Sequence, residues 1–600
     1  MKKSNELLTR KDVPTEYTWD LESLFENQNE WDNEYDSVKK LAGDFQAHKG
    51  IVTLSSENLY KALVDRDNLY RRAGNLGVYA HMKLDEDTTN NISQGLSDKG
   101  LNLYAEVNEK TSFLEPEIIS LDKDKLELFI EENSELKLYT QFLDDLIRQK
   151  SHILSAREES ILAQIGEFSN SPQKIFSMLD NADLKFPTIK DETGKDVEIT
   201  HGNFIPLMES GNRQVRKAAF EAVYTTYRSF KNTYASILDG DLKKNIFNSK
   251  IRNFNSTRAA SLSSNNIPVN VYDNLISAIH DNLDSMHKYM DIRKRALGVD
   301  ELHMYDLYTP IVKEVDFKIP YMEAVELIKT ALHPLGKDYS TIMDEAFSSR
   351  WVDIYENKGK RSGAYSSGSY DSKPYILMNY HDTLDNAFTL AHELGHSIHS
   401  YLTRKTQPFV YGNYSIFVAE VASTANEALL LDHMLKNAKD KNQKLYLLNH
   451  YLESFRTTVF RQTMFAEFEL KINQHIESGG ALTADYLCEE YKKLNELYYG
   501  PNVVIDKDIE MEWARIPHFY YNYYVFQYAT GFSAAVALSE KILKEGDEAV
   551  DKYLDFLKSG ESDYPINVLK KAGVDMTTEE PVKNAMALFK RLVDEMDSLI

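Results

Sequence analysis

The sequence predicts a mainly α-helical protein with two lobes and a small β-sheet. Three observations carry this prediction. The chain has 600 residues, more than one hydrophobic core usually organises, so at least two lobes are expected. Only 25 Gly and 15 Pro occur, and so few turn-forming residues favour long helices over many short strands. Apolar residues also recur at spacings of three and four, the period of an amphipathic helix.

The first predicted lobe consists of successive amphipathic helices, most clearly over residues 29–47, 57–84 and 158–165. No fixed-period repeat is present, which argues against a solenoid. Residues 184–199 alternate around a turn that contains Gly194 and predict a β-hairpin. We place the boundary near this hairpin, with a helical N-terminal lobe over residues 1–200 and a second domain over residues 201–600.

A second non-helical stretch covers residues 359–380 and ends in a predicted strand over residues 374–380. This strand stands just before a buried helix that carries two histidines. Its backbone could pair with an extended peptide, which is a general mode of peptide recognition. A minor structural sheet is the other interpretation, and the two are compatible.

Charge and cysteine content exclude several classes of protein. The chain carries 69 basic and 93 acidic side chains, a net charge of −24 without a basic stripe, so nucleic acid and anionic membranes are unsuitable partners. Cys488 is the single cysteine, so no intrachain disulfide can form. No apolar run is long enough for a membrane span, and we expect a cytoplasmic protein.

The histidines stand in residues 387–399, Ala-Phe-Thr-Leu-Ala-His-Glu-Leu-Gly-His-Ser-Ile-His. His392 and His396 are four residues apart and therefore project from one helical face, where both can bind one metal ion. Glu393 follows the first histidine and can act as a general base without binding the metal. The alternative is two helical histidines that share a face by chance, but apolar neighbours bury this helix and buried imidazoles need polar partners.

A catalytic zinc needs a third protein ligand. Glu420 is a charged residue at the start of an apolar helix over residues 417–427, where a metal bond would offset the cost of its burial. His399 is the other candidate, but it would lie about 10.5 Å from His392 along one helix axis, which suits a single ion poorly. We choose Glu420 and expect His399 either to contact the metal ligands from behind or to line the cleft. Glu427 could orient a ligand imidazole or form a structural salt bridge.

Residues 515–528 contain an unusual concentration of tyrosines after His518. Such a segment is often an aromatic packing face, but tyrosine hydroxyls and a histidine can also stabilise the oxyanion that develops during attack on an amide. Beside a zinc site we favour the second interpretation for His518, Tyr520 and Tyr524. Tyr520 and Tyr524 are four residues apart and are expected to share a helical face. Tyr521 and Tyr523 are weaker candidates.

Together these motifs resemble oligoendopeptidase F, in the thimet oligopeptidase-like group of zinc peptidases. The resemblance rests on residues 392–399, on Glu420 within residues 417–427, and on residues 516–520 and 528–531. It implies a two-lobed helical zincin-type metallopeptidase with a deep central channel, and one Zn²⁺ per chain on His392, His396 and Glu420. It also implies Glu393 as the catalytic base and cleavage of internal bonds in short unstructured peptides.

Two other functions remain open from the sequence. A metallocarboxypeptidase of similar helical architecture can carry the same His-Glu helix, and a metal-free helical scaffold could bind peptides without cleaving them. The roles assigned to the metal ligands and to the residues that stabilise the oxyanion follow from their side-chain chemistry and spacing. Cleavage preference, the limit on peptide length and the oligomeric state do not follow from the sequence.

Overall fold

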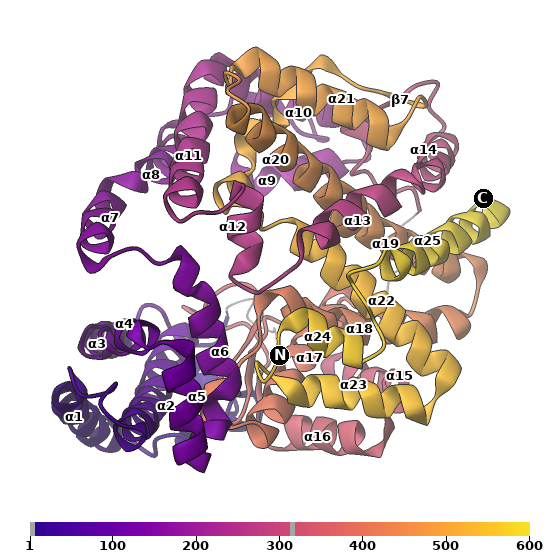
Figure 1. Ribbon diagram of the computed structural model, residues 1–600. Coiled ribbons are helices and arrows are strands. Elements are labelled where there is room, and N and C mark those ends of the chain that lie inside the picture. The colour runs from indigo at the N-terminus through magenta and orange to yellow at the C-terminus, as the bar shows by residue number, and fades with distance from the viewer. Residues whose placement is uncertain (1–6, 313–317) are drawn as a thin grey trace. The chain divides into compact units, whose positions relative to one another are not determined.

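The computed structural model describes residues 7–312 and 318–600, and it confirms the mainly helical class (Figure 1). The chain forms two compact units that interleave along the sequence. Unit 1 consists of Met1–Lys150, Phe317–Asp432 and Leu538–Gly573, and unit 2 consists of Ser151–Asp316, His433–Ala537 and Val574–Ile600. This grouping by contacts differs from a division along the chain, and the boundary between residues 1–200 and 201–600 stays a prediction, as does a deep channel.

Unit 1 contains the first helices, a three-stranded sheet and the helices near the predicted metal ligands. Its elements are α1 Gln28–Phe45, α2 Ser56–Glu86, α3 Asn91–Thr111, α4 Leu114–Ser120, α5 Lys123–Glu132, α6 Thr140–Gln149, α15 Tyr321–Ala331, α16 Gly336–Ser348, β4 Val352–Asp353, β5 Tyr365–Ser367, β6 Tyr375–Leu377, α17 Leu384–Thr406, α23 Asp547–Ser559 and α24 Pro565–Lys571. Helices α18 Ile416–Lys436 and α22 Phe526–Glu545 each run from one unit into the other.

The core of unit 1 begins with α1, α2 and α3, which pack side by side. Asn27 and Ser55 cap the first turns of α1 and α2 with their side chains, as the sequence of an exposed helix start favours. Trp31 is completely buried, and its indole N–H donates to the Leu76 carbonyl at 3.0 Å. Burial of the ring and satisfaction of its polar atom together fix α1 against α2.

The small sheet lies against α17, as predicted. Its strand order is β4-β6-β5, with β4 parallel and β5 antiparallel to β6. The predicted strand over residues 374–380 is β6, but β6 is the central strand and both of its edges are occupied. An extended peptide therefore cannot pair with it. Strand β5 is an edge strand, and its side away from β6 is not paired with any strand in the described part of the chain.

A buried ion network holds β4 in place. Asp353 is 1% exposed and binds Lys360 at 2.7 Å and Arg10 at 2.6 Å. Burial alone would raise the pKa of the Asp353 carboxyl, but the charges and hydrogen bonds of Lys360 and Arg10 lower it below its usual range. Loss of one partner would leave an uncompensated charge inside the protein, so the network fixes this end of the sheet.

Unit 2 contains the predicted hairpin, β1 Thr188–Lys190 paired antiparallel with β2 Asp196–Glu198, and a short parallel pair, β3 Leu302–His303 with β7 Val503–Val504. Its helices are α7 Ala156–Ser169, α8 Ser171–Met178, α9 His201–Glu209, α10 Arg213–Ser229, α11 Lys231–Ile251, α12 Thr257–Ser263, α13 Val269–His280, α14 Leu283–Leu297, α19 Lys441–Ser454, α20 Arg461–Glu477, α21 Ala484–Tyr499 and α25 Glu580–Leu599. None of the described helices is long and apolar enough to cross a membrane.

A buried carboxylate in unit 2 supports the segment that carries His518. Glu512 accepts a hydrogen bond from Tyr491 at 2.5 Å and pairs with Arg461 at 2.7 Å. Glu512 and Tyr491 are buried and Arg461 is partly exposed, so the network satisfies the buried polar atoms and anchors the irregular chain that follows. The single cysteine, Cys488, is buried on α21.

Candidate active site

Helix α17 carries the predicted metal ligands on a regular, largely buried helix. Thr383 caps its first turn by accepting a hydrogen bond from the Asn386 N–H at 3.2 Å. One face packs into the core through Leu390, Leu394 and Ile398. Because the helix is regular, the spacing of four residues between its histidines places both imidazoles on one side.

Gly395 allows α18 to approach α17 closely. A methyl group at this position would lie 2.6 Å from Cα of Ser423 and 2.8 Å from the carbonyl oxygen of Ala422. The obstacle is helix backbone, which cannot rotate away. Asn426 adds a hydrogen bond from its side-chain amide to the Ala391 carbonyl at 3.0 Å. The glycine thus sets the spacing that brings Glu420 beside the histidines, a role that no local sequence pattern indicates.

The ligand atoms of His392, His396 and Glu420 form a compact triangle. The two Nε2 atoms are 3.2 Å apart, and Oε2 of Glu420 lies 3.3 Å from His392 Nε2 and 3.5 Å from His396 Nε2. Ligands bound to zinc at about 2.0–2.1 Å with tetrahedral angles lie about 3.3 Å from one another. The triangle therefore fits a tetrahedral ion with one open position. Among the described residues this is the group of three or more ligand side chains that could hold a metal.

Carboxylates flank His392 on both ring nitrogens. Its Nδ1 bonds Glu427 at 2.5 Å while its Nε2 faces Glu420. Burial would lower the pKa of His392, but hydrogen bonds to Glu420 and Glu427 outweigh it and raise the pKa to about 10. Burial would likewise raise the pKa of Glu420, yet the two histidines hold it well below its usual range. A metal would replace the proton shared by these groups, with Glu427 left to orient the imidazole.

Glu393 stands apart from the ligand triangle and is 8% exposed. Burial raises the pKa of its carboxyl, and the neighbouring His392 and His396 oppose this only in part. The backbone N–H of Ser366, on β5, favours its charged form, while the Ser366 hydroxyl lies 2.7 Å from the Ser397 hydroxyl. A carboxyl group with a raised pKa next to a metal-binding triangle is suited to accept a proton and then return it.

His399 is buried and lies outside the ligand triangle. Its ring stacks on Tyr414 with centroids 3.8 Å apart and also contacts Phe556 at 5.3 Å. Burial, followed by the neighbouring charge of His396, lowers the pKa of His399 to about 3, so the ring is neutral. The side chain is enclosed between Tyr414 and Phe556, so it does not line an open cleft.

The tyrosine segment belongs to unit 2 and does not form the predicted helix. Pro517–Tyr520 is a short 3-10 helix, Asn522 and Tyr523 adopt positive φ angles of 48° and 59°, and α22 begins only at Phe526. Tyr520 and Tyr524 therefore do not share a helical face, and that expectation was wrong. Tyr520 is 7% exposed and packs on Phe176 with ring centroids 4.5 Å apart.

His518, Tyr524 and Tyr528 form a cluster within this segment. The rings of His518 and Tyr524 lie 6.2 Å apart, those of Tyr524 and Tyr528 5.4 Å apart, and the Tyr528 hydroxyl is 3.5 Å from His518 Nε2. Tyr521 is 47% exposed and touches the edge of the same imidazole. Tyr528 had received no predicted role, although its spacing of four residues from Tyr524 across the start of α22 was a usable signal.

The helical fold, the ligand triangle and the adjacent carboxylate define a class, the metal-dependent helical peptidases. Residues 206–588 match peptidase family M3, and residues 117–186 match the oligopeptidase F family. The chain belongs to peptidase family M3, which confirms the resemblance to oligoendopeptidase F.

Individual relatives agree with this assignment along nearly the whole chain. The chain is 53% identical to oligopeptidase PepF of Bacillus subtilis, with 100% of this chain and 89% of the relative covered. It is 44% identical to group B oligopeptidase PepB of Streptococcus agalactiae, with 98% of each covered. The crystal structure of oligoendopeptidase-F from Enterococcus faecium matches with a TM-score of 0.74 at 41% identity, over 95% of this chain and 99% of that one.

Proposed function

We propose that this peptidase is a zinc-dependent oligoendopeptidase that hydrolyses internal bonds of short unstructured peptides in the cytoplasm. The observation that carries the proposal is the triangle of His392, His396 and Glu420, whose sides of 3.2–3.5 Å suit tetrahedral zinc, beside the carboxyl of Glu393. The names of relatives from Bacillus and Enterococcus, an oligopeptidase and an oligoendopeptidase, support the substrate class. A single cysteine is compatible with a reducing compartment.

In this proposal the three residues of the triangle hold the metal, and the neighbouring Glu427 and Glu393 have separate roles. Zinc bound by three protein ligands supplies Lewis acidity, which makes water a nucleophile at neutral pH. Glu427 fixes the orientation of His392 through the bond to Nδ1. Glu393 takes a proton from the attacking water and transfers it to the departing amine. Its raised pKa brings it closer to the pH at which both transfers are possible.

His518 and Tyr524 are proposed to donate hydrogen bonds to the oxyanion that develops on the scissile carbonyl. Both are partly exposed and carry donors on one side of an aromatic cluster. Burial lowers the pKa of His518, so its ring is neutral and can donate without a permanent charge. Tyr520 stays in the proposal as a weaker candidate, because its ring is packed against Phe176.

The free edge of β5 is proposed to align the substrate. The strand stands at the edge of its sheet, and its residue Ser366 lies beside Glu393. A peptide paired with this edge would be extended, which favours unstructured chains over folded proteins.

Elemental analysis and product mapping test the proposal. The purified chain is expected to hold one zinc, and a mixed peptide library should yield internal cleavage products that disappear after zinc removal and return with added zinc. A peptide with a blocked C-terminus should still be cleaved, which separates this activity from a metallocarboxypeptidase. A chain that binds peptides but holds no stoichiometric metal would instead be a peptide-binding scaffold, and the proposal would be wrong.

A further inference from the structure

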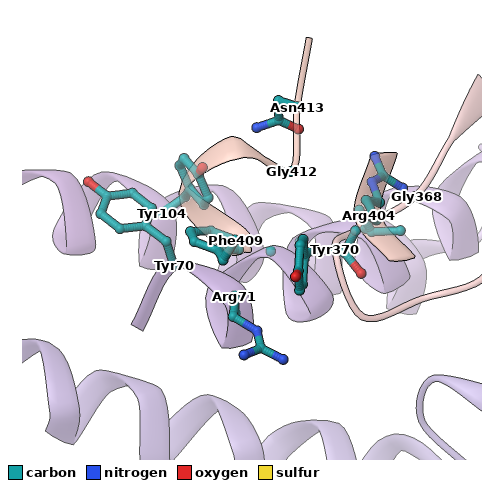
Figure 2. A pocket seen from close by; sticks show the side chains of 13 residues that line it. Tyr70, Arg71, Tyr104, Gly368, Tyr370, Arg404, Phe409, Gly412 and Asn413 are labelled. Carbon is teal, nitrogen blue, oxygen red and sulfur yellow. The ribbon is translucent and has the colours of Figure 1, made fainter. Parts of the chain in front are cut away.

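Unit 1 contains a pocket of about 320 Å³ between α2, α3, the turn after β5 and the chain that follows α17. Figure 2 shows Arg404 and Gly368 at one end and Tyr70 and Tyr104 at the other. A volume of this size is within the range of small-ligand sites. The lining residues are Tyr70, Arg71, Gly74, Gly77, Val78, Tyr104, Gly368, Ser369, Tyr370, Arg404, Phe409, Gly412 and Asn413.

Arg404, near the end of α17, forms no ion pair with any residue that the structure describes. Its Nη1 atom is fully buried and has no hydrogen-bond partner among the residues the structure describes. Burial lowers the pKa of its guanidinium, although the side chain stays charged at any physiological pH. Gly368 leaves room for it, since a methyl group there would lie 2.9 Å from Nη1.

The other arginine of the pocket shows what Arg404 lacks. Arg71 binds Asp371 through two contacts, of 2.5 and 3.2 Å, so its charge is already neutralised. None of the described residues that line the pocket is acidic. A half-buried guanidinium that lines a pocket and has no acidic partner among the described residues can bind an anionic ligand, and its planar fork matches a carboxylate.

We propose that Arg404 receives the C-terminal carboxylate of a bound peptide, with the terminal side chain against the aromatic wall of the pocket. Tyr370 and Phe409 pack edge to face at 5.4 Å, and Tyr70 and Tyr104 at 5.9 Å, which provides apolar surface for such a side chain. The identification of the anion as a substrate carboxylate rests on the proposed peptidase function. The presence of an anion site does not.

Strand β5 connects this pocket to the metal ligands within unit 1. Ser366 lies beside Ser397 and Glu393, and Gly368, just after the strand, lies beside Arg404. Along α17, Arg404 is about 12 Å beyond His396. An extended chain spans that distance with about three or four residues. Cleavage should therefore favour a bond about three or four residues from a free C-terminus, unlike that of a carboxypeptidase, which removes one.

Calorimetric titration of the full chain tests the site apart from catalysis. The probes are N-acetyl-alanyl-phenylalanine, the same peptide as its C-terminal amide, and inorganic phosphate. Each is titrated into the Glu393→Gln chain before and after zinc removal, so that neither cleavage nor the metal accounts for binding. We expect at least about tenfold tighter binding of the free carboxylate than of the amide, with or without zinc.

Two variants assign the effect to one side chain. Arg404→Gln should abolish the discrimination, whereas Lys405→Gln, which removes the same charge from an exposed neighbour on the same helix, should preserve it. Equal binding of acid and amide by the chain with Arg404 intact would overturn the proposal, whether or not Arg404→Gln folds. Binding of phosphate that excludes the peptide acid would also overturn it, in favour of a free anion.

Product lengths then separate this inference from the peptidase activity. In the active enzyme, C-terminal amidation should remove the preference for C-terminal fragments of about three or four residues and raise KM. If the chain binds the peptide acid more tightly than the amide but cleaves no peptide, the proposed site stands and the peptidase function is wrong. If the chain cleaves peptides but amidation changes neither their binding nor the product lengths, the peptidase function stands and the proposed site is wrong.

Discussion

The helix pair α17–α18 and the segment over residues 517–528 present polar side chains in contrasting ways. On the helix pair, regular backbone converts a spacing of four residues into a triangle of ligand atoms. In the other segment a 3-10 helix, two residues with positive φ and a new helix follow one another. Tyr520 and Tyr524 are also four residues apart there, but they do not share a face. A spacing of four residues thus predicts a shared face on the regular helix α17, but it fails for Tyr520 and Tyr524, where the helix is interrupted.

The largest effect is expected at the centre of the regular site. Glu393→Gln should reduce kcat by about 10³-fold, because the amide cannot accept a proton from water. Zinc content should be unchanged, since Glu393 lies outside the ligand triangle. Steady-state kinetics with an internally quenched peptide, together with metal analysis, measures both quantities. Full activity with normal zinc would remove Glu393 from its proposed role.

In the irregular segment, we expect the hydroxyls of Tyr524 and Tyr520 to contribute unequally to catalysis. Tyr524→Phe should reduce kcat by about 10²-fold if its hydroxyl stabilises the oxyanion, with KM little changed. Tyr520→Phe is the matched control, because its ring packs on Phe176 and should keep that contact without the hydroxyl. The same kinetic assay compares them. Equal losses in both variants would mean that the buried tyrosine also reaches the substrate.

The helix contact at Gly395 gives a third, intermediate effect. Gly395→Ala should destabilise the protein by about 1–3 kcal/mol and weaken zinc binding, because the methyl group meets the backbone of α18. Gly95→Ala on α3 is the control, since nothing lies within 4 Å of its added methyl group. That change should leave zinc binding intact and stabilise its helix slightly. Denaturant melts measure the stability of both variants, and zinc titration measures their metal affinity. If Gly395→Ala and Gly95→Ala behave alike, the close approach of α18 to Gly395 does not have the proposed effect.

The last prediction concerns the pH dependence of stability, through the residue that supports the irregular segment. Glu469 is fully buried, accepts the Tyr523 N–H at 2.5 Å, and burial raises its pKa from 4.5 to about 8. The neutral carboxyl stabilises the fold below pH 4.5, and this stability is lost as pH rises through about 8, at about 1.4 kcal/mol per pH unit. Glu469→Gln should flatten that slope in denaturant melts at pH 5 to 8. An unchanged slope would show that Glu469 is charged in the folded protein.

Much of the fold, and the grouping of His392, His396 and Glu420, could be predicted from the sequence. Helical periodicity revealed α1, α2 and α7, and the period of two revealed the hairpin of β1 and β2. Both are local patterns. The function of Gly395 depends on backbone from α18 and the edge position of β5 on pairing with β6, so neither appears in a local pattern. Asn522 and Tyr523 adopt positive φ although neither is a glycine, so the sequence did not indicate the break in the helix there.

The buried cysteine has a practical consequence for following movement. Cys488 contacts Met511 at 3.5 Å, and burial raises the pKa of its thiol, so it is a poor target for maleimide reagents. New cysteines at exposed Lys405 and Lys493, one in each unit, could therefore carry a pair of fluorescent dyes without removal of the native thiol. Energy transfer between the dyes would report, molecule by molecule, whether the units change their separation when a peptide binds.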